Sequence, residues 1–343
     1  RSDCRGPRRG VLGGARGALV SAPLVEVERL VKHYPGGGGL FGPRRPPVKA
    51  VDGVSFHVAP GETLGLVGES GSGKSTIGRA VLRLEPPTAG TVCFEGHDLA
   101  TLDAAALRAL RRRMQIVFQD PFGSLNPRRT IGDSIAEGLV IHRLAASSAL
   151  SGRVAELLAE VGLDPSYAGR YPHEFSGGQR QRIGIARALA VEPRFIVCDE
   201  PVSALDVSVQ AQVLNLLLDL RERRGLAYLF IAHDLAVVRQ VAHRVAVMYL
   251  GTIVEIGPAR TVISTPRHPY TQALVSAVPA PDPSTSRARI VLEGDPPSPS
   301  APPPGCPFAP RCFHPARDAR CTSERPVLRV VADREVACHY AES

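Results

Sequence analysis

A glycine-rich segment between an apolar strand and a helix constrains the fold of this chain more than any other feature. It matches the pattern Gly-x4-Gly-Lys-Ser/Thr and reads Gly68-Glu69-Ser70-Gly71-Ser72-Gly73-Lys74-Ser75-Thr76. Glycines let the backbone bend so that consecutive N–H groups face phosphates, and the positive end of the following helix adds to the attraction. Lys74 is expected to bridge the phosphates and Ser75 to ligate Mg²⁺. The segment therefore predicts a nucleotide-phosphate site.

Strand and helix patterns alternate along most of the chain. Residues 24–31 and 51–58 alternate like strands, and Thr63–Val67 reads as a buried strand. Residues from about 120 to 175 combine Pro, Gly and helical stretches, which predicts a mostly helical insert. The alternation then resumes with helix 178–190, strand 195–198, helix 209–223, strand 228–231, helix 235–241 and strand 245–249. This order predicts a mainly parallel sheet with helices on its faces.

The helix expected at residues 209–223 has a clear apolar periodicity. The residues at helical spacing are Val209, Val213, Leu216, Leu217 and Leu220. Gly225 follows and can adopt the left-handed conformation that ends a helix. We therefore expect this helix to end at Gly225.

Two carboxylates follow the apolar strand at residues 195–198. Asp199 lies at the carboxyl end of that strand, where it can hold Mg²⁺ through water, and Glu200 can polarise an attacking water molecule. Two acids after a strand could also form an ordinary polar loop. The phosphate loop elsewhere in the chain favours the catalytic interpretation.

A second N–H-rich segment lies further along the chain. It reads Phe175-Ser176-Gly177-Gly178-Gln179 and precedes a helix that carries Arg180, Arg182 and Arg187. Serine and two glycines at the start of a helix can make a second anion site. Taken alone, a helix cap followed by turn glycines is the simpler explanation.

The order of these segments resembles that of ATP-binding-cassette (ABC) ATPases over about residues 24–258. The full pattern is the phosphate loop, Gln119 after strand 115–118, residues 175–179, Asp199-Glu200, Ser203-Ala204-Leu205-Asp206, and His233 after a strand. The resemblance implies an α/β fold of the P-loop NTPase class. Its parts would be a mainly parallel sheet, a helical subdomain at about residues 120–175 and an N-terminal antiparallel β-subdomain. It also implies that the chain binds ATP and Mg²⁺ and hydrolyses the ATP.

The resemblance gives roles to residues that have no distinctive signal of their own. It implies that Tyr34 stacks on adenine and that Gln119 touches Mg²⁺ and reports to a membrane partner. His233 would contact the γ-phosphate. The catalytic set would consist of Glu200, Gln119 and His233.

The resemblance also implies that the complete site needs two subunits. Ser176 and Gly178, supported by Gly177 and Gln179, would contact the γ-phosphate of a nucleotide held by the other subunit. Asp206 would line the seam of that dimer. ATP would then join two modules, and hydrolysis would separate them.

Three further stretches resemble the oligopeptide/dipeptide importer ATPases, a family with nickel-uptake relatives. They are residues 48–56 (VKAVDGVSF), 120–128 (DPFGSLNPR) and 268–274 (HPYTQAL). The Arg-rich loop before Val48 is similar to that of the second ATPase subunit of such systems. The implied partners are another ABC ATPase subunit, which is a paralogue or a second copy, two transmembrane permeases and an extracytoplasmic peptide-binding protein. The chain would be a peripheral subunit on the cytoplasmic face of the membrane.

The chain is expected to divide into three parts. Residues 1–22 are rich in Gly and Arg and read as a disordered tail. Residues 23–258 form the nucleotide-binding domain, and residues 259–343 form an extension of the oligopeptide-importer type. Eight of the fifteen residues 296–310 are Pro, so this part reads as an extended linker to a small Cys-containing terminus.

Four cysteines lie in that terminus, at Cys306, Cys312, Cys321 and Cys338. Their spacing lacks the closely spaced Cys pairs of structural zinc sites. Four thiolates can hold a 4Fe–4S iron–sulfur cluster, and the corresponding extension of peptide-importer ATPases is associated with one. Zinc, unligated thiols and a disulfide remain open alternatives.

The charge balance leaves another class of function open. The chain has 41 basic and 33 acidic residues, a formal net charge of +8, which permits a nucleic-acid partner. A non-transport cassette ATPase acting on nucleic acid or ribosomes is therefore the alternative. Such proteins usually carry duplicated cassettes, long coiled coils or zinc-binding inserts, and the sequence shows none, so no nucleic acid is expected. No stretch approaches the ~18 apolar residues of a membrane span.

Overall fold

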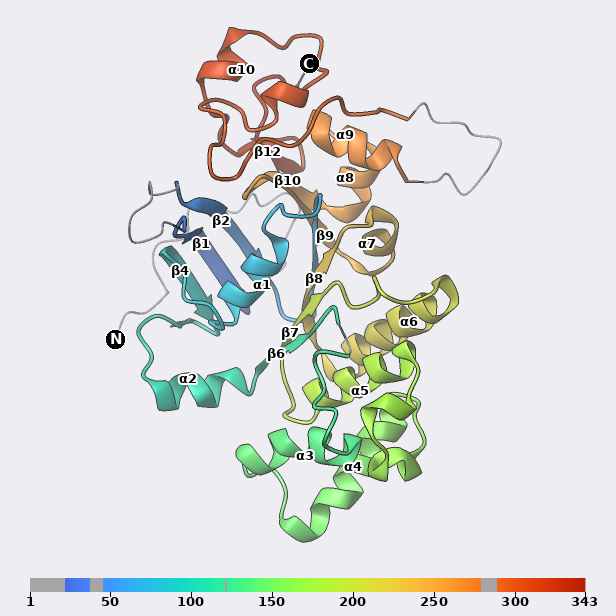
Figure 1. Cartoon of the computed structure of the whole chain (residues 1–343). Helices are drawn as coiled ribbons and strands as arrows, with labels where there is room; N and C mark the ends of the chain where they lie inside the picture. The colour runs from blue at the N-terminus through green and yellow to red at the C-terminus, as the bar shows by residue number, and fades with distance from the viewer. Residues whose placement is uncertain (1–21, 38–45, 121, 279–288, 343) are drawn as a thin grey trace, which may run out of the picture. The chain divides into compact units, whose positions relative to one another are not determined.

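The computed structural model describes residues 22–37, 46–120, 122–278 and 289–342 (Figure 1). The tail expected at residues 1–22 lies outside these ranges except for its last residue. The chain separates into two compact units. The first unit contains residues 58–62 and 101–230, and the second contains residues 25–57, 63–100 and 231–343. None of the helices in the described ranges is long and apolar enough to cross a membrane.

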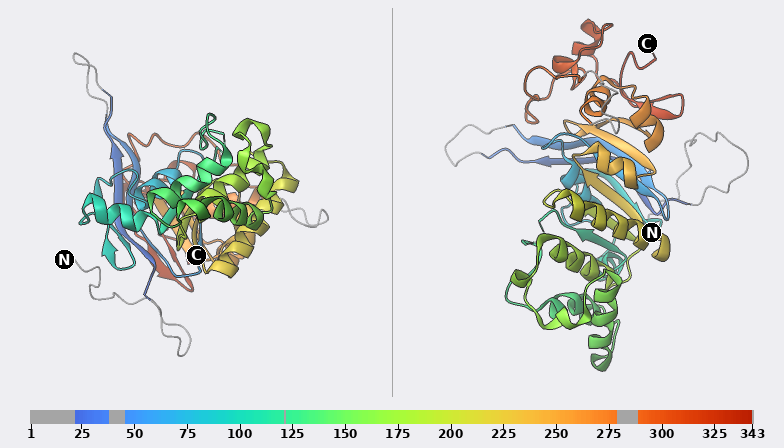
Figure 2. Two further views of the ribbon diagram at one scale, coloured as in Figure 1. Left: turned by 90° about the horizontal axis from the view of Figure 1, so that it is seen from below. Right: turned by 90° about the vertical axis from the view of Figure 1, so that its right-hand side faces the viewer.

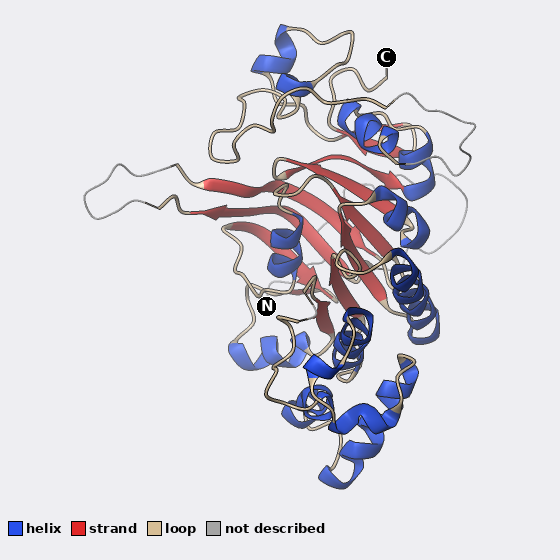
Figure 3. Cartoon of the chain, turned by 45° about the vertical axis from the view of Figure 1, so that its right-hand side comes forward, coloured by secondary structure: helices blue, strands red, loops and turns tan. Residues whose placement is uncertain are grey.

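The second unit begins with an antiparallel sheet, which Figure 3 shows as long neighbouring strands. Its strand order is β2 (Val48–Val58), β1 (Val25–Tyr34), β4 (Ala89–Phe94) and β5 (His97–Asp98). The strand β1 pairs antiparallel with β4, and β4 with β5. Val25 and Val27 are buried and Glu28 is exposed, as expected for strands with one face covered. This is the expected N-terminal antiparallel element.

The second unit also contains five consecutive strands of a mixed sheet. Their order is β11 (Arg329–Val331), β12 (Arg334–Val336), β10 (Thr252–Pro258), β9 (Arg244–Tyr249) and β3 (Thr63–Val67). The strand β3 runs parallel to β9, whereas β9, β10, β12 and β11 pair antiparallel in turn. All five residues of β3 are buried, as its unbroken apolar sequence predicts.

Four helices that precede residue 279 accompany these strands in the described part of the second unit. They are α1 (Lys74–Val81), α7 (Leu235–Val241), α8 (Ala259–Ser264) and α9 (Pro269–Ser276). The helix α7 packs on β3, and α8 packs on β10 and α9. The helix α1 starts at Lys74, directly after the last glycine of the glycine-rich segment, Gly73, so the expected strand–loop–helix order is present.

The first unit contains the parallel pair β6 (Met114–Val117) and β7 (Phe195–Asp199). In strand order β7 is followed by β8 (Ala227–Ala232), of which residues 227–230 belong to this unit. The helices of this unit are α2 (Ala104–Arg111), α3 (Ile131–Ile141), α4 (Leu150–Glu160), α5 (Gly177–Leu189) and α6 (Val207–Arg224). The helix α3 packs against α4 and α5 (Figure 1).

The described residues of the region from 120 to 175 form helices joined by turns and contain no strand. Besides α3 and α4 it holds the short 3-10 helices η1 (Ser147–Ala149), η2 (Pro165–Gly169) and η3 (Pro172–Glu174). Ile131, Ile135 and Leu157 are fully buried. Together with the mixed sheet, these helices give the α/β fold expected from the sequence.

Each end of the helix α6 is set by a single residue. The Asp206 carboxylate accepts a hydrogen bond from the Val209 N–H at 3.0 Å, so the helix begins at Val207 rather than at Val209. It ends at Gly225, whose φ of 64° is left-handed, as predicted.

The C-terminal segment folds onto β10, which the sequence reading did not anticipate. The strand β12 pairs with β10 through Glu255–Val336 and Ile256–Glu335. Figures 1 and 2 show the red C-terminal segment next to the orange strands. Residues 289–308 are without helix or strand, in keeping with their proline content, and the 3-10 helix η4 (Ala309–Arg311) follows. Later comes α10 (Ala319–Ser323). The strands β11 and β12 have three residues each, too short for an alternation signal.

A buried ion pair secures β12 to β10. Glu255 is 0% exposed and Arg334 is 6% exposed, and the Arg334 Nη1 donates to the Glu255 carboxylate at 3.3 Å. The same carboxylate accepts from the backbone N–H groups of Arg267 and His268. The pair is fully satisfied by neighbours, which is the condition under which buried charges are tolerated.

We expect Arg334→Met to lower the free energy of unfolding by about 3–5 kcal/mol, because the Glu255 carboxylate would stay buried without its cation. Urea unfolding followed by circular dichroism measures this change. Arg320→Met is the matched control, since Arg320 pairs with Glu324 on the surface and exposed pairs contribute little. Equal unfolding midpoints for the two variants would show that the buried pair does not stabilise the fold.

Candidate functional site

The glycine-rich segment forms a loop between β3 and α1 in the second unit. Lys74 is 4% exposed, and its Nζ donates to the backbone oxygens of Gly68 at 2.8 Å and Glu69 at 2.9 Å. The Ser72 N–H donates to the Glu69 oxygen at 3.2 Å. The lysine therefore lies across the loop with its ammonium group at the loop's centre, where a phosphate would meet it.

Gly73 shows why the loop requires glycine. Its φ is 102°, and a Cβ built there would lie 2.0 Å from the backbone oxygen of Ala50. Any side chain would clash with β2 and strain the backbone. The loop thus depends on β2 as well as on its own sequence.

Two residues that sequence reasoning left out of the site contact this loop. The Tyr270 hydroxyl accepts a hydrogen bond from the Glu69 N–H at 2.8 Å. The Arg311 guanidinium donates to the Glu69 carboxylate. Tyr270 lies within the stretch at residues 268–274, which had signalled a subgroup, whereas nothing in the sequence marks Arg311.

Tyr34, the expected adenine contact, lies at the end of β1 in the second unit. Its hydroxyl donates to Glu85, and the Lys32 Nζ lies 5.0 Å from the ring centroid. Burial and the hydrogen bond to Glu85 raise the pKa of Tyr34. The hydroxyl is thus engaged by the protein, which leaves the ring as the part that could stack on a base.

Three of the expected magnesium-binding and hydrolytic residues, Gln119, Asp199 and Glu200, lie in the first unit. Asp199 ends β7 and is 4% exposed. Glu200 follows with a φ of 47°, a conformation that a non-glycine residue adopts rarely. The Gln119 Nε2 donates to the Glu200 carboxylate at 3.1 Å. The structure therefore brings Gln119 and Glu200 together, and the strained backbone at Glu200 is typical of functional positions.

The second N–H-rich segment caps α5 in the first unit. The Ser176 Oγ accepts from the Gln179 N–H at 3.3 Å, and the Gln179 Oε1 accepts from the Ser176 N–H at 3.0 Å. This reciprocal capping box matches the simpler interpretation of these residues. Gly178 packs so closely that an added Cβ would lie 2.3 Å from the Val209 side chain, so a contact with α6 also requires it.

Asp206 and His233 lie at other helix and strand ends. In the first unit the Asp206 carboxylate caps α6, and the hydrogen bond from the Val209 N–H lowers its pKa. In the second unit His233 is exposed directly after β8, and the Asp234 carboxylate caps α7 through the Ala236 N–H at 2.7 Å. The candidate residues therefore divide between the two units.

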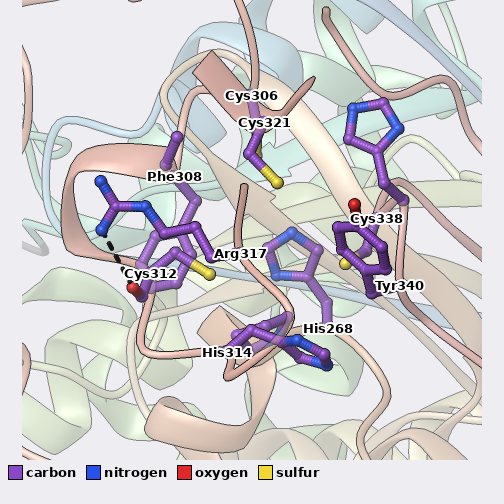
Figure 4. Close-up of a pocket in the computed structure, with 12 residues that line it drawn as sticks. His268, Cys306, Phe308, Cys312, His314, Arg317, Cys321, Cys338 and Tyr340 are labelled. Atoms are coloured by element: carbon purple, nitrogen blue, oxygen red, sulfur yellow. Dashed lines mark hydrogen bonds between the residues drawn. The ribbon is translucent and has the colours of Figure 1, made fainter. Parts of the chain in front are cut away.

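The four late cysteines line one pocket in the second unit (Figure 4). None of the four forms a disulfide. The pocket has a volume of about 20 Å³, and its wall includes His268 and Phe308. Burial raises the pKa of the Cys306 thiol to about 11 and lowers the pKa of His268 to about 3. These groups are therefore neutral in the pocket at physiological pH.

The expectation of an iron–sulfur cluster receives no direct support from this arrangement. Among the residues that the structure describes, no group of three or more His, Cys, Asp or Glu side chains is placed to hold a metal ion. The pocket volume is that of about one water molecule. The fold nevertheless brings four cysteines that are far apart in the sequence to the wall of one pocket.

Comparison with known families assigns two regions of the chain. Residues 51–203 match the ABC transporter family profile, and residues 254–321 match the C-terminal region of oligopeptide/dipeptide transporters. A probable peptide ABC transporter ATP-binding protein of Sinorhizobium fredii is 54% identical over 93% of this chain and 90% of its own. The oligopeptide transport ATP-binding protein AppF of Bacillus subtilis is 52% identical over 92% of this chain and 97% of its own. The chain belongs to the ABC transporter family.

Solved structures agree with this assignment. An ATP-binding cassette solved as a dimer in a post-hydrolysis state, bound to ADP and Pi, is 29% identical to this ABC ATPase. The TM-score is 0.61, and the match covers 69% of this chain and 99% of the other. A second dimeric cassette structure has the same TM-score at 28% identity.

Proposed function

We propose that this chain is the ATP-hydrolysing subunit of an importer that takes up peptides through partner membrane proteins. The observation that carries the proposal is the identity of more than half of the aligned positions with peptide-transport ATP-binding proteins along nearly their whole length. The match extends into residues 254–321, where β10, α8 and α9 form part of the described fold. The resemblance therefore covers the extension as well as the cassette.

The loop Gly68–Thr76 would hold the phosphates of ATP. Its N–H groups and the start of α1 supply positive potential, and Lys74 already points into the loop. Ser75, Asp199 and Gln119 offer the hydroxyl, carboxylate and amide oxygens that Mg²⁺ prefers. Mg²⁺, when bound, would offset phosphate charge. The ring of Tyr34 would stack on adenine.

Glu200 would act as the base for the attacking water. Its carboxylate can accept the water proton, and the hydrogen bond from Gln119 holds that carboxylate in place. His233 would contact the γ-phosphate from the end of β8. Hydrolysis thus depends on side chains that are carried by strand ends, where packing restricts their motion.

A second cassette would complete the site. The segment 176–179 and Asp206 would face the nucleotide held by that partner, which is a paralogue or another copy of this chain. Dimeric cassettes among the structural neighbours support this arrangement. Two transmembrane permeases would hold the pair at the cytoplasmic face of the membrane, with the Gln119–Pro127 region (residues 119–127) transmitting closure. A peptide-binding protein would deliver substrate outside the cell.

Peptide uptake by cells tests the proposal. Cells that carry Glu200→Gln in place of the wild-type chain are expected to lose uptake of a radiolabelled oligopeptide while expressing the protein at the normal level. Retained uptake would contradict the importer function. Uptake of labelled nickel in the same cells separates the peptide importers from their nickel relatives.

The alternative function on nucleic acid or ribosomes makes the opposite biochemical prediction. Its ATPase rate would rise with duplex DNA or ribosomes. The importer proposal predicts stimulation only by vesicles that contain the permeases and the loaded binding protein. No observation on the described fold favours the alternative.

We also propose that the cysteine pocket holds a 4Fe–4S cluster. The convergence of Cys306, Cys312, Cys321 and Cys338 supplies a suitable set of sulfur ligands. A cluster holds its cysteines further apart than a single zinc ion does, so a site that lacks single-ion geometry is compatible with it. The pocket would have to widen, and the thiols would have to lose their protons.

Iron and sulfide analysis of protein purified without oxygen tests the cluster. We expect iron and acid-labile sulfide in equal amounts and visible absorption that is lost in Cys312→Ser. Cys198→Ser is the control, because Cys198 is buried in β7 and is not one of the residues that line the pocket. A colourless, iron-free protein with full ATPase activity would remove the cluster from the proposal.

A further inference from the structure

The C-terminal extension reaches the phosphate loop through one arginine. Arg311 lies in η4, next to Cys312, and its Nη1 donates to the Glu69 carboxylate oxygens at 3.2 and 3.0 Å. The Arg311 side chain is only 9% exposed. The two residues are 242 positions apart in the chain. The contact therefore exists only because the extension folds against this part of the second unit.

Every polar group of Glu69 is engaged. Its N–H donates to the Tyr270 hydroxyl, its backbone oxygen accepts from the Lys74 ammonium, and its carboxylate accepts from Arg311. The Ser72 N–H also donates to that backbone oxygen, so two of the four partners, Tyr270 and Arg311, come from the extension. The extension thus holds one residue of the phosphate loop by both its backbone and its side chain.

An aromatic cluster fixes Arg311 and Tyr270 relative to one another. Tyr270, Tyr249 and Phe308 are at most 2% exposed, and their ring centroids lie 4.7 to 5.5 Å apart. Phe308 directly precedes η4 and also lines the cysteine pocket (Figure 4). Packing of this kind restricts side chains to single positions. The guanidinium is therefore presented to the loop by a rigid base.

The charge of Glu69 explains why such a contact would matter for ATP. A carboxylate in a loop that receives phosphates repels them unless a cation offsets it. A guanidinium group keeps its proton at physiological pH, and that of Arg311 donates directly to the Glu69 carboxylate. Arg311 is thus a permanent cation at this position.

We propose that Arg311 is a positioning residue for ATP binding, which neutralises Glu69 and keeps its carboxylate turned away from the phosphates. The proposal rests on the assignment of residues 68–76 to the nucleotide. Arg311 itself touches no phosphate in this account. It acts through Glu69, and it makes the extension part of the nucleotide site.

A double-mutant cycle on the full-length protein tests the proposal. Arg311→Gln is expected to raise the Kd for ATP-Mg and the KM of hydrolysis roughly ten-fold, with kcat unchanged, as for loss of one charge-assisted contact. Glu69→Gln removes the carboxylate that needs neutralising, so the double variant is expected to regain near wild-type Kd and KM. Arg320→Gln, a surface change in the same extension, is the control and should behave as wild type.

The outcomes separate the possible failures. Unchanged Kd in Arg311→Gln would overturn the proposal. Equal weakening in Arg311→Gln and in the double variant would also overturn it, because the arginine would then act by supporting the fold. Lys74→Ala, measured alongside, reports on the assignment of the loop. If Lys74→Ala leaves the Kd unchanged, the nucleotide site itself is wrong, whatever the arginine variants do.

Discussion

Glu200→Gln is expected to slow ATP hydrolysis by at least ~10²-fold, which is the scale of losing a positioned base, while ATP binding is retained. The amide has nearly the same size as the carboxylate, so the backbone at Glu200 and the contact with Gln119 need not change. What is lost is the ability to accept the proton of the water. Steady-state phosphate release measures the rate, and a filter assay with labelled ATP measures binding.

The same variant is also expected to accumulate as an ATP-bound dimer, because closure would proceed but hydrolysis would not follow. Size-exclusion chromatography with and without ATP-Mg shows this shift. Glu222→Gln is a suitable control, since the Glu222 side chain is 74% exposed on α6. Turnover at the wild-type rate in Glu200→Gln would exclude Glu200 as the base.

The parts of the fold that the sequence predicted well are those fixed by short-range effects. The buried strand β3, the start of α1 at Lys74 and the end of α6 at Gly225 each depend on residues within a few positions. Apolar runs, glycines and caps act locally. For the same reason the capping role of Ser176 was foreseen as an alternative and is present in the structure.

The C-terminal extension was harder to anticipate because long-range pairing forms it. The strand β12 has three residues and is stabilised by β10 and by the pair of Arg334 with Glu255. No local pattern marks such a strand. The proline-rich sequence correctly predicted irregular chain before η4, but it gave no indication that the chain returns to the sheet.

The candidate site, like the C-terminal extension, was predictable from the sequence only in part. The sequence marked the phosphate loop itself, yet the contacts of Glu69 with Arg311 and Tyr270 join segments that are more than two hundred positions apart. Similarly, the spacing of the cysteines argues against a zinc motif, whereas their convergence on one pocket appears only after folding. The motifs thus identified the loop that would bind phosphate, whereas only the tertiary structure shows which distant residues contact that loop.

Lys74→Ala is expected to weaken ATP binding by roughly 10²-fold, because one ammonium group supplies more than one charge-assisted hydrogen bond to the phosphates. Titration calorimetry of the full-length protein with ATP-Mg measures the Kd. Thermal unfolding gives a second measurement, since a ligand at one hundred times its Kd stabilises the folded state by about 2.7 kcal/mol. The wild type should gain this stability at an ATP concentration where the variant gains almost none.

Lys49→Ala is the matched control for that experiment, since it removes a lysine from β2 that has no proposed role at the nucleotide. Lys74 also donates to the Gly68 and Glu69 carbonyls, so its removal affects the loop itself. Unfolding without ATP measures this cost separately. If Lys74→Ala and Lys49→Ala bind ATP equally well, the loop is not the phosphate site. If only Lys74→Ala loses binding, and the loss is larger than its lower stability accounts for, then Lys74 attracts the phosphates directly. The phosphates would then bind at the loop that carries Glu69, and this is why neutralisation of Glu69 by Arg311 would favour ATP binding.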